Sequence, residues 1–179
     1  MKRAIIAGLA AVALFSAAPS ASLAQNQTEA QKEAVQKANS ARLAQFLGAN
    51  GGIAHAGFRQ SEKVPTNYTA IVKEGLKYCD YLEVVFSVSK DNTIAVLVYP
   101  HLNGRYINIE KARDSSGMMK QMLHFNLSNF MYWGADEQGD VFARYTVTLE
   151  SGFPDEAMKV VLYSIAPNDL YAQQLNYFM

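Results

Sequence analysis

The spacing of hydrophobic and polar residues changes several times along this chain, and each change marks an expected element. From Thr28 to Leu47 apolar residues recur at helical spacing, which predicts an amphipathic helix ended by Gly48. Its apolar positions are Ala30, Ala34, Val35, Ala38, Ala41, Ala44 and Leu47. The segment from Gly48 to about Thr69 is polar and irregular and contains Pro65, which predicts a flexible connection.

Three strands are expected next. From Tyr81 to Ser89 the pattern has period two, and a turn at 90–92 leads into a β-branched run from Thr93 to Tyr99. That run predicts a strand covered on both faces and ended by Pro100, and the third strand is expected at Arg105–Glu110. Leu82, Val84, Phe86 and Val88 are assigned to one face, and Val85, Ile94, Val96 and Val98 to the opposite one.

The second half predicts a helix, a hairpin and a further helix. Ser115 or Ser116 can cap the first helix, which carries Met118, Met119, Met122, Leu123 and Phe125. The hairpin pairs 130–135 with 141–150 through a four-residue loop, 136–139. After Pro154 the apolar stripe is Ala157, Met158, Val161, Leu162 and Ile165. Pro167 should break this helix, and Asn168 or Asp169 can cap a last helical piece to Phe178.

These elements predict an α+β fold, an antiparallel sheet of about five strands with helices in the order α-β-β-β-α-β-β-α. One domain is expected after a signal peptide at 1–24, with an N-terminal helix and flexible loop at 25–69 and an α+β core at 70–179.

The N-terminus predicts export. Lys2 and Arg3 precede an apolar run from Ala4 to Phe15, and a small-residue segment ends at Ala24, which is the layout of a cleavable secretory signal. The apolar run is shorter than the roughly 20 residues that span a membrane. We therefore expect cleavage after Ala24, a periplasmic or secreted bacterial protein, and no membrane insertion after cleavage.

Charge argues against a nucleic-acid partner. The chain has 16 Lys+Arg and 16 Asp+Glu. Removing residues 1–24 removes two basic residues and no acid, so the balance becomes 14 against 16, a formal charge of −2. Nucleic-acid-binding domains instead carry a basic excess.

Candidate chemistry is sparse. Cys79 is the lone cysteine, and the three histidines, His55, His101 and His124, lack a second ligand at helical spacing. No phosphate loop or nucleophile elbow occurs, and a Cys79–His101 pair rests on residue type alone. We expect no catalytic residues, no metal and no cofactor.

Apolar residues in excess of one core face suggest a partner surface instead. With a loop at 136–139, residue 133 would lie opposite residue 142, so Met131, Trp133 and Phe142 would point away from the core, with Arg144 close enough to stack on Trp133. Phe130, Tyr132, Ala143 and Tyr145 would face the core. Met118 and Met122 allow two interpretations, a deformable partner surface or core filler. For the sheet residues the alternative is coverage by helices on both faces.

The segment from Met118 to Leu175 resembles the YbjN family. The matching features are Phe125-Asn126 at the end of the helix, Asn129-Phe130 before the next strand, the 136–139 turn, the long 141–149 strand and the acidic helix start after Pro154. The resemblance implies the fold of the small dimeric type III secretion chaperones. Those chaperones act before export, whereas this chain carries its own export signal.

The expected function is a non-catalytic periplasmic binding or chaperone-like module for a protein or peptide, with a homodimer as one form. One alternative is a small enzyme that uses Cys79 or a histidine. Another is a structural or stress-related envelope component that assembles through its first helix.

Overall fold

The computed structural model describes residues 28–179, and the predicted signal peptide and its cleavage site lie outside them. The first helix, α1 (Glu29–Asn50), begins with a capping box in which Thr28 and Gln31 bond each other's backbone N–H groups. It runs through the expected stop at Gly48. Its buried residues are Ser40, Leu43, Phe46 and Leu47, so the expected alanine stripe is mostly exposed. Only the C-terminal half of α1 joins the core.

The segment expected to be irregular contains two strands. A 3-10 helix, η1 (Gly51–Ala54), is followed by β1 (Arg59–Gln60) and β2 (Asn67–Val72). Tyr68, Ala70 and Val72 of β2 are buried, and the strand pairs along its length with β3 (Tyr81–Val88). The polar residues around β2 obscured its strand pattern in the sequence. Pairing with the apolar strand β3 stabilises β2.

The central hairpin corrects the expected faces. β4 (Thr93–Leu102) pairs with β3 so that Val96 lies opposite Phe86 and Val98 opposite Val84, which places these four residues on one buried face. Val85 lies opposite Leu97 on the other, partly buried face, as expected. The opposite face of β4 is only partly buried, so the strand is not covered on both faces. β4 also continues past Pro100, because His101 and Leu102 pair with β5 (Arg105–Tyr106).

The remaining elements follow the expected order with shifted bounds. The third expected strand shrinks to β5, because Asn108 caps a 3-10 helix, η2 (Ile109–Lys111). α2 (Ser115–Ser128) is capped by Asp114 instead of a serine. β6 (Tyr132–Ala135) and β7 (Val141–Thr148) form the second hairpin, and α3 (Asp155–Tyr163), α4 (Asn168–Leu175) and η3 (Asn176–Phe178) complete the chain. The predicted interruption at Pro167 separates α3 from α4.

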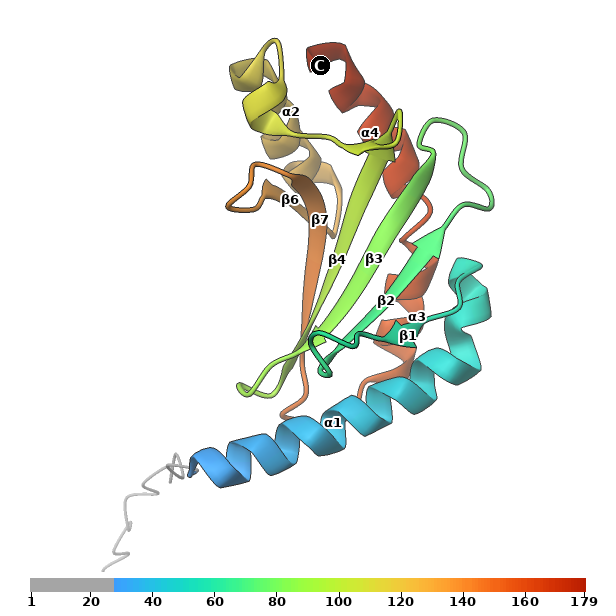
Figure 1. Cartoon of the computed structure of the whole chain (residues 1–179), viewed down its shortest axis with the longest axis vertical. Coiled ribbons are helices and arrows are strands. Elements are labelled where there is room, and N and C mark those ends of the chain that lie inside the picture. Colours follow the sequence, from blue (N-terminus) through green and yellow to red (C-terminus); the bar gives the residue numbers. More distant parts are fainter. Residues whose placement is uncertain (1–27) are drawn as a thin grey trace, which may run out of the picture.

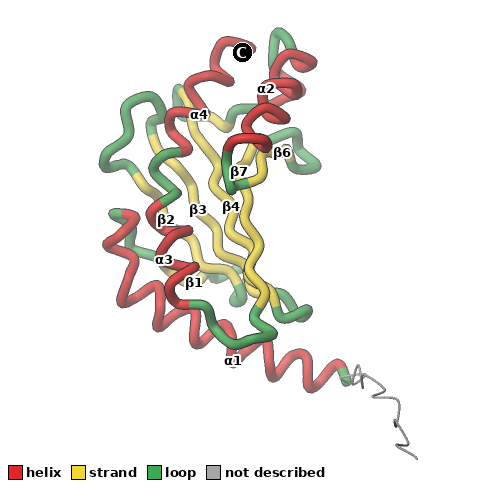
Figure 2. Tube along the Cα trace, turned by 180° about the vertical axis from the view of Figure 1, so that it is seen from behind, coloured by secondary structure: helices red, strands yellow, loops and turns green. Residues whose placement is uncertain are grey.

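The strands form one antiparallel sheet in the order β1-β2-β3-β4-β7-β6, with β5 paired to β4. The α+β class is confirmed, with seven strands in place of about five. α3 and α4 lie behind the sheet in Figure 1 and in front of it in Figure 2, so they cover one face, while α1 crosses one end.

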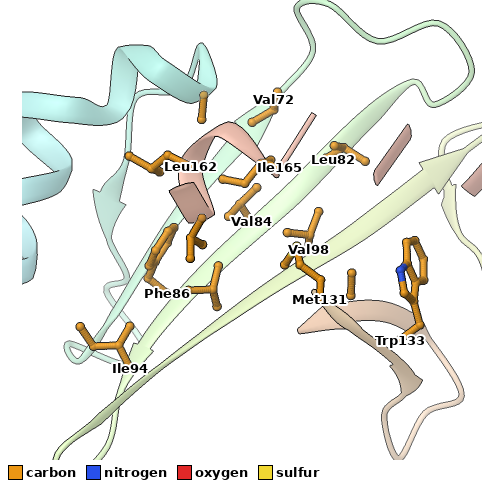
Figure 3. Close-up of a cluster of buried hydrophobic side chains, with 14 of the residues drawn as sticks. Val72, Leu82, Val84, Phe86, Ile94, Val98, Met131, Trp133, Leu162 and Ile165 are labelled. Carbon is orange, nitrogen blue, oxygen red and sulfur yellow. The ribbon is translucent and has the colours of Figure 1, made fainter. Parts of the chain in front are cut away.

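The core lies between that covered face and the helices. The expected stripe after Pro154 is confirmed at Met158, Val161, Leu162 and Ile165, whereas Ala157 is exposed. Figure 3 shows Leu162 and Ile165 among the side chains of Val84, Phe86 and neighbouring strand residues. The expected inward alternation of β7 also holds for Val141, Ala143, Val147 and Leu149.

Candidate functional site

The six residues predicted to form a partner surface divide between the core and the open sheet face. Met131 and Trp133 are 0% and 2% exposed, and Met118 and Met122 are also buried. Phe142 and Arg144 lie on the open face, which α3 and α4 leave uncovered (Figure 1). The prediction is therefore wrong for Met131 and Trp133, which the structure places in the core. Of the two interpretations of Met118 and Met122, the structure supports core filler.

A one-residue difference in register explains the error in β6. Trp133 lies opposite Ala143, not Phe142, because the hairpin loop has five residues, 136–140. The Asp136 carboxylate accepts the backbone N–H groups of Gln138 and Asp140 at 3.0 and 2.9 Å and so closes the longer loop. A shift of one residue turns every side chain of a strand to the other face.

The shift moves Trp133 into an aromatic contact in the core. Its ring centroid lies 5.3 Å from that of Phe125 and 5.8 Å from that of Tyr171. Figure 3 shows Met131 and Trp133 on the side of the sheet that carries Val98. Arg144 lies opposite Tyr132, and its Nε donates to Thr146 Oγ1 at 3.3 Å, so the expected stacking on Trp133 does not occur.

Helix α2 is apolar on two sides. Its inner side carries Met118, Met122 and Phe125. Its outer side carries Met119, Leu123 and Leu127, which are 48%, 62% and 85% exposed. These three residues follow the i, i+4, i+8 spacing of one helical face. That spacing was visible in the sequence, but two parallel apolar stripes made the outer one indistinguishable from the core stripe.

Tyr132 of β6 extends the outer stripe. The register shift that buries Trp133 turns Tyr132 outward, where it is 61% exposed. With Leu123 and Leu127 it lines a shallow depression of about 410 Å³, whose other lining residues are Lys120, His124 and Asn126. We call Met119, Leu123, Leu127 and Tyr132 the α2–β6 patch.

Asn126 holds β6 against α2. Its Oδ1 accepts the Trp133 backbone N–H at 2.6 Å, and its Nδ2 donates to the Trp133 carbonyl at 3.2 Å. One side chain thus occupies the backbone groups that a further strand would use at this edge of the sheet. The α2–β6 patch is therefore built on two elements joined by side-chain hydrogen bonds.

Aromatic side chains continue the patch over the open sheet face. A Cβ at Gly134 would lie 3.4 Å from the Phe142 ring and 3.7 Å from the Tyr132 ring, so both rings flank the space above this glycine. Phe142 contacts Tyr99, and Tyr99 contacts Tyr106, each with ring centroids 5.7 Å apart. A row of neighbouring rings, which we call the aromatic path, thus leads from α2 to the end of β4 through Tyr132, Phe142, Tyr99 and Tyr106.

His101 and Glu83 lie at the end of that path. The His101 ring lies 4.0 Å by centroid from both Tyr81 and Tyr106. Burial lowers the pKa of His101, although the nearby carboxylates of Glu83, Asp140 and Asp80 oppose that shift. Burial therefore favours the neutral form of the His101 imidazole. Sequence spacing offered no signal for this group, because Glu83 and His101 meet only through the pairing of β3 with β4.

Cys79 has the surroundings of a structural thiol. It belongs to the buried core, and burial, followed by the Asp169 carboxylate, strongly raises the pKa of the thiol. Asp169 itself accepts the backbone N–H groups of Lys77, Tyr78 and Cys79, which ties the loop before β3 to α4. A thiol kept protonated is a poor nucleophile.

Within residues 28–179 no three His, Cys, Asp or Glu side chains are grouped so that they could hold a metal ion. No helix in the same range has the length and apolar character needed to cross a membrane.

Comparison with known proteins relates the chain to one solved fold. No family model matches the sequence, and no curated protein sequence matches it. The crystal structure of YbjN from E. coli, described there as a candidate transcription regulator, superposes with a TM-score of 0.50, covering 77% of this chain and 91% of that chain at 11% identity. At this identity the likeness concerns the fold alone, so the chain has a YbjN-like α+β fold.

Proposed function

We propose that this protein is a non-catalytic, exported binding module that holds a polypeptide partner on the α2–β6 patch. The observation that carries the proposal is the outer side of α2, where three large apolar side chains stay exposed although the inner side of the same helix already fills the core. Soluble proteins seldom expose contiguous apolar surface of this kind without a binding role.

The composition of the patch suits a protein ligand. Leu123, Leu127 and Tyr132 surround a depression whose lining is almost entirely apolar in its exposed area, and Met119 adds a flexible side chain. Apolar area removed from water contributes about 25 cal/mol per Å² before the costs of association are subtracted. An amphipathic helix or an extended apolar segment could cover such a surface.

The absence of recognisable chemistry supports a binding role over an enzymatic one. The sequence contains no catalytic motif, and the thiol considered as a nucleophile is buried with a raised pKa. The secretory layout of residues 1–24 supports the periplasm as the place where binding occurs.

Site-specific photocrosslinking in cells tests the proposal. A photoreactive phenylalanine analogue at position 123 should yield a discrete protein adduct. The same analogue at position 160 should not, because Val160 is similarly exposed but lies on α3. With the analogue at position 119, Leu127→Asp should reduce adduct formation by roughly tenfold or more, as expected for loss of a hot-spot contact.

The matched control is Val160→Asp, which adds the same charge to an exposed aliphatic position outside the patch. An adduct with twice the mass of the mature chain would identify the partner as a second copy. Equal adduct yields at 123 and 160, or none at 123, would refute the proposed function.

A further inference from the structure

The Glu83 carboxylate lies among aromatic rings at the end of the open sheet face. Glu83 is opposite Tyr99 in the β3–β4 pairing, and the next pair toward the sheet end is Tyr81 with His101. Tyr106 of β5 completes this row on the other side of His101. Glu83 is therefore framed by three tyrosine rings and one imidazole.

The polar atoms around Glu83 use only part of the hydrogen-bonding capacity of its carboxylate. The Tyr106 hydroxyl donates to Glu83 Oε2 at 2.7 Å. His101 Nε2 lies 3.5 Å from the same oxygen. The His101 side chain is 5% exposed, and neither of its ring nitrogens has a hydrogen-bond partner among the described residues. A buried, unpartnered imidazole beside a carboxylate marks a site that is polar but incomplete.

The local charge is negative, and its carboxylates are not paired with a Lys or Arg among the described residues. Within residues 28–179, no Lys or Arg nitrogen lies within 4.0 Å of a carboxylate oxygen of Glu83, Asp80, Asp136 or Asp140. Burial, followed by the charges of Asp136 and Glu83, raises the pKa of Tyr99 to about 12. Arg59 lines a depression of about 450 Å³ together with Glu83 but forms no ion pair with it.

We propose that Glu83, with the rings of Tyr81, Tyr99 and Tyr106, receives a Lys or Arg side chain of the polypeptide partner. A carboxylate provides the opposite charge, and aromatic faces attract a cation through their quadrupoles. The aliphatic stem of such a side chain can lie along the neighbouring aromatic surface. This inference rests on the proposed function and adds the chemistry of the partner, which is an apolar segment with a basic residue beyond one of its ends.

The aromatic path supports this order of residues in the partner. Tyr132 belongs to the α2–β6 patch, Phe142 lies between Tyr132 and Tyr99, and Tyr99 is the cross-strand neighbour of Glu83. A bound segment whose apolar residues cover α2 can therefore extend over the sheet toward Glu83.

NMR titration of the protein with small probes tests this site. N-acetyl-lysine methylamide should shift the ring signals of Tyr81, His101 and Tyr106 in a saturable way. N-acetyl-norleucine methylamide, which has a similar stem and no charge, should not. In Glu83→Gln the lysine probe should bind roughly tenfold more weakly, because an interaction with a charged group is lost. The amide oxygen of Gln can still accept the Tyr106 hydroxyl.

The control variant is Glu150→Gln, which removes the same charge at an exposed position after β7 and should leave the titration unchanged. Equal binding of both probes, or equal binding of the lysine probe to wild type and a folded Glu83→Gln, would overturn the inference. Adducts at position 123 without binding of the lysine probe would remove this inference and leave the proposed function standing. Binding of the lysine probe without adducts at position 123 would refute the α2–β6 patch as the binding surface and leave only a cation site at Glu83.

Discussion

Adjacent residues of β6 have opposite environments. Trp133 is buried against Phe125 and Tyr171, whereas Tyr132 is exposed beside α2. The sequence pattern indicated the reverse, because a four-residue loop would have placed Trp133 on the face of Phe142. The fifth loop residue, Asp140, decides which aromatic side chain is available to a partner.

Paired substitutions at these two positions test the register. Trp133→Ala should destabilise the fold by roughly 3–5 kcal/mol, because it empties a large packed site. Tyr132→Ala should change the free energy of unfolding by about 0.5 kcal/mol or less, as is typical of surface positions. Urea denaturation of both variants measures this difference. If Tyr132→Ala destabilised the fold more than Trp133→Ala, the pairing of β6 with β7 would be wrong.

At the scale of elements, β6 is a short edge strand that depends on a helix. Asn126 is the residue through which α2 satisfies both backbone groups of Trp133. An edge strand with free backbone groups can pair with another chain. The Asn126 side chain therefore supports the patch and limits edge-to-edge association at the same time.

Asn126→Ala should cost about 1–3 kcal/mol of unfolding free energy, because it leaves a partly buried N–H and carbonyl without partners. It should also increase concentration-dependent self-association. Denaturation and sedimentation velocity measure the two effects. Gln121→Ala is the matched control, since it removes an amide side chain from the same helix whose one bond is to the exposed side chain of Gln174, so its cost should be smaller. Equal stability of the two variants would show that β6 does not depend on this contact.

At the scale of the whole molecule, the helices divide the sheet into a covered face and an open face. The covered face holds the core. The open face, which α3 and α4 leave uncovered in Figure 1, carries the aromatic path that joins the α2–β6 patch to Glu83. The two proposed contacts therefore lie on one continuous surface, which suits an extended partner segment.

Export decides which compartment supplies that partner. Because Lys2 and Arg3 precede an apolar run and a small-residue site, mass spectrometry of the native protein should find an N-terminus at or near Gln25 in the periplasmic fraction. Ala24→Leu, which replaces the small residue before the expected cut, should slow processing and retain the precursor. A full-length cytosolic form as the main species would contradict export and move the search for partners to the cytosol.

Local pattern alone was sufficient for much of this fold. The period-two runs located β3 and β7, a β-branched run located β4, and proline with acidic residues located the start of α3, because spacing and capping act over a few neighbouring residues. The same logic identified the α+β class and the inward side of β7. It did not identify the exposed apolar residues of α2 and β6, because it assigned the surface to Met131, Trp133, Met118 and Met122, which are buried.

Other features of the fold and of the candidate site depend on tertiary contacts. β2 exists as a strand through its pairing with β3, and the face that each residue of β6 presents depends on one loop residue and on the partner strand. Glu83 and His101 are neighbours because of strand register, which no local spacing encodes. Helix α2 has two apolar stripes, and one of them remains exposed because no other element packs against it. Which stripe is buried depends on how the whole chain packs.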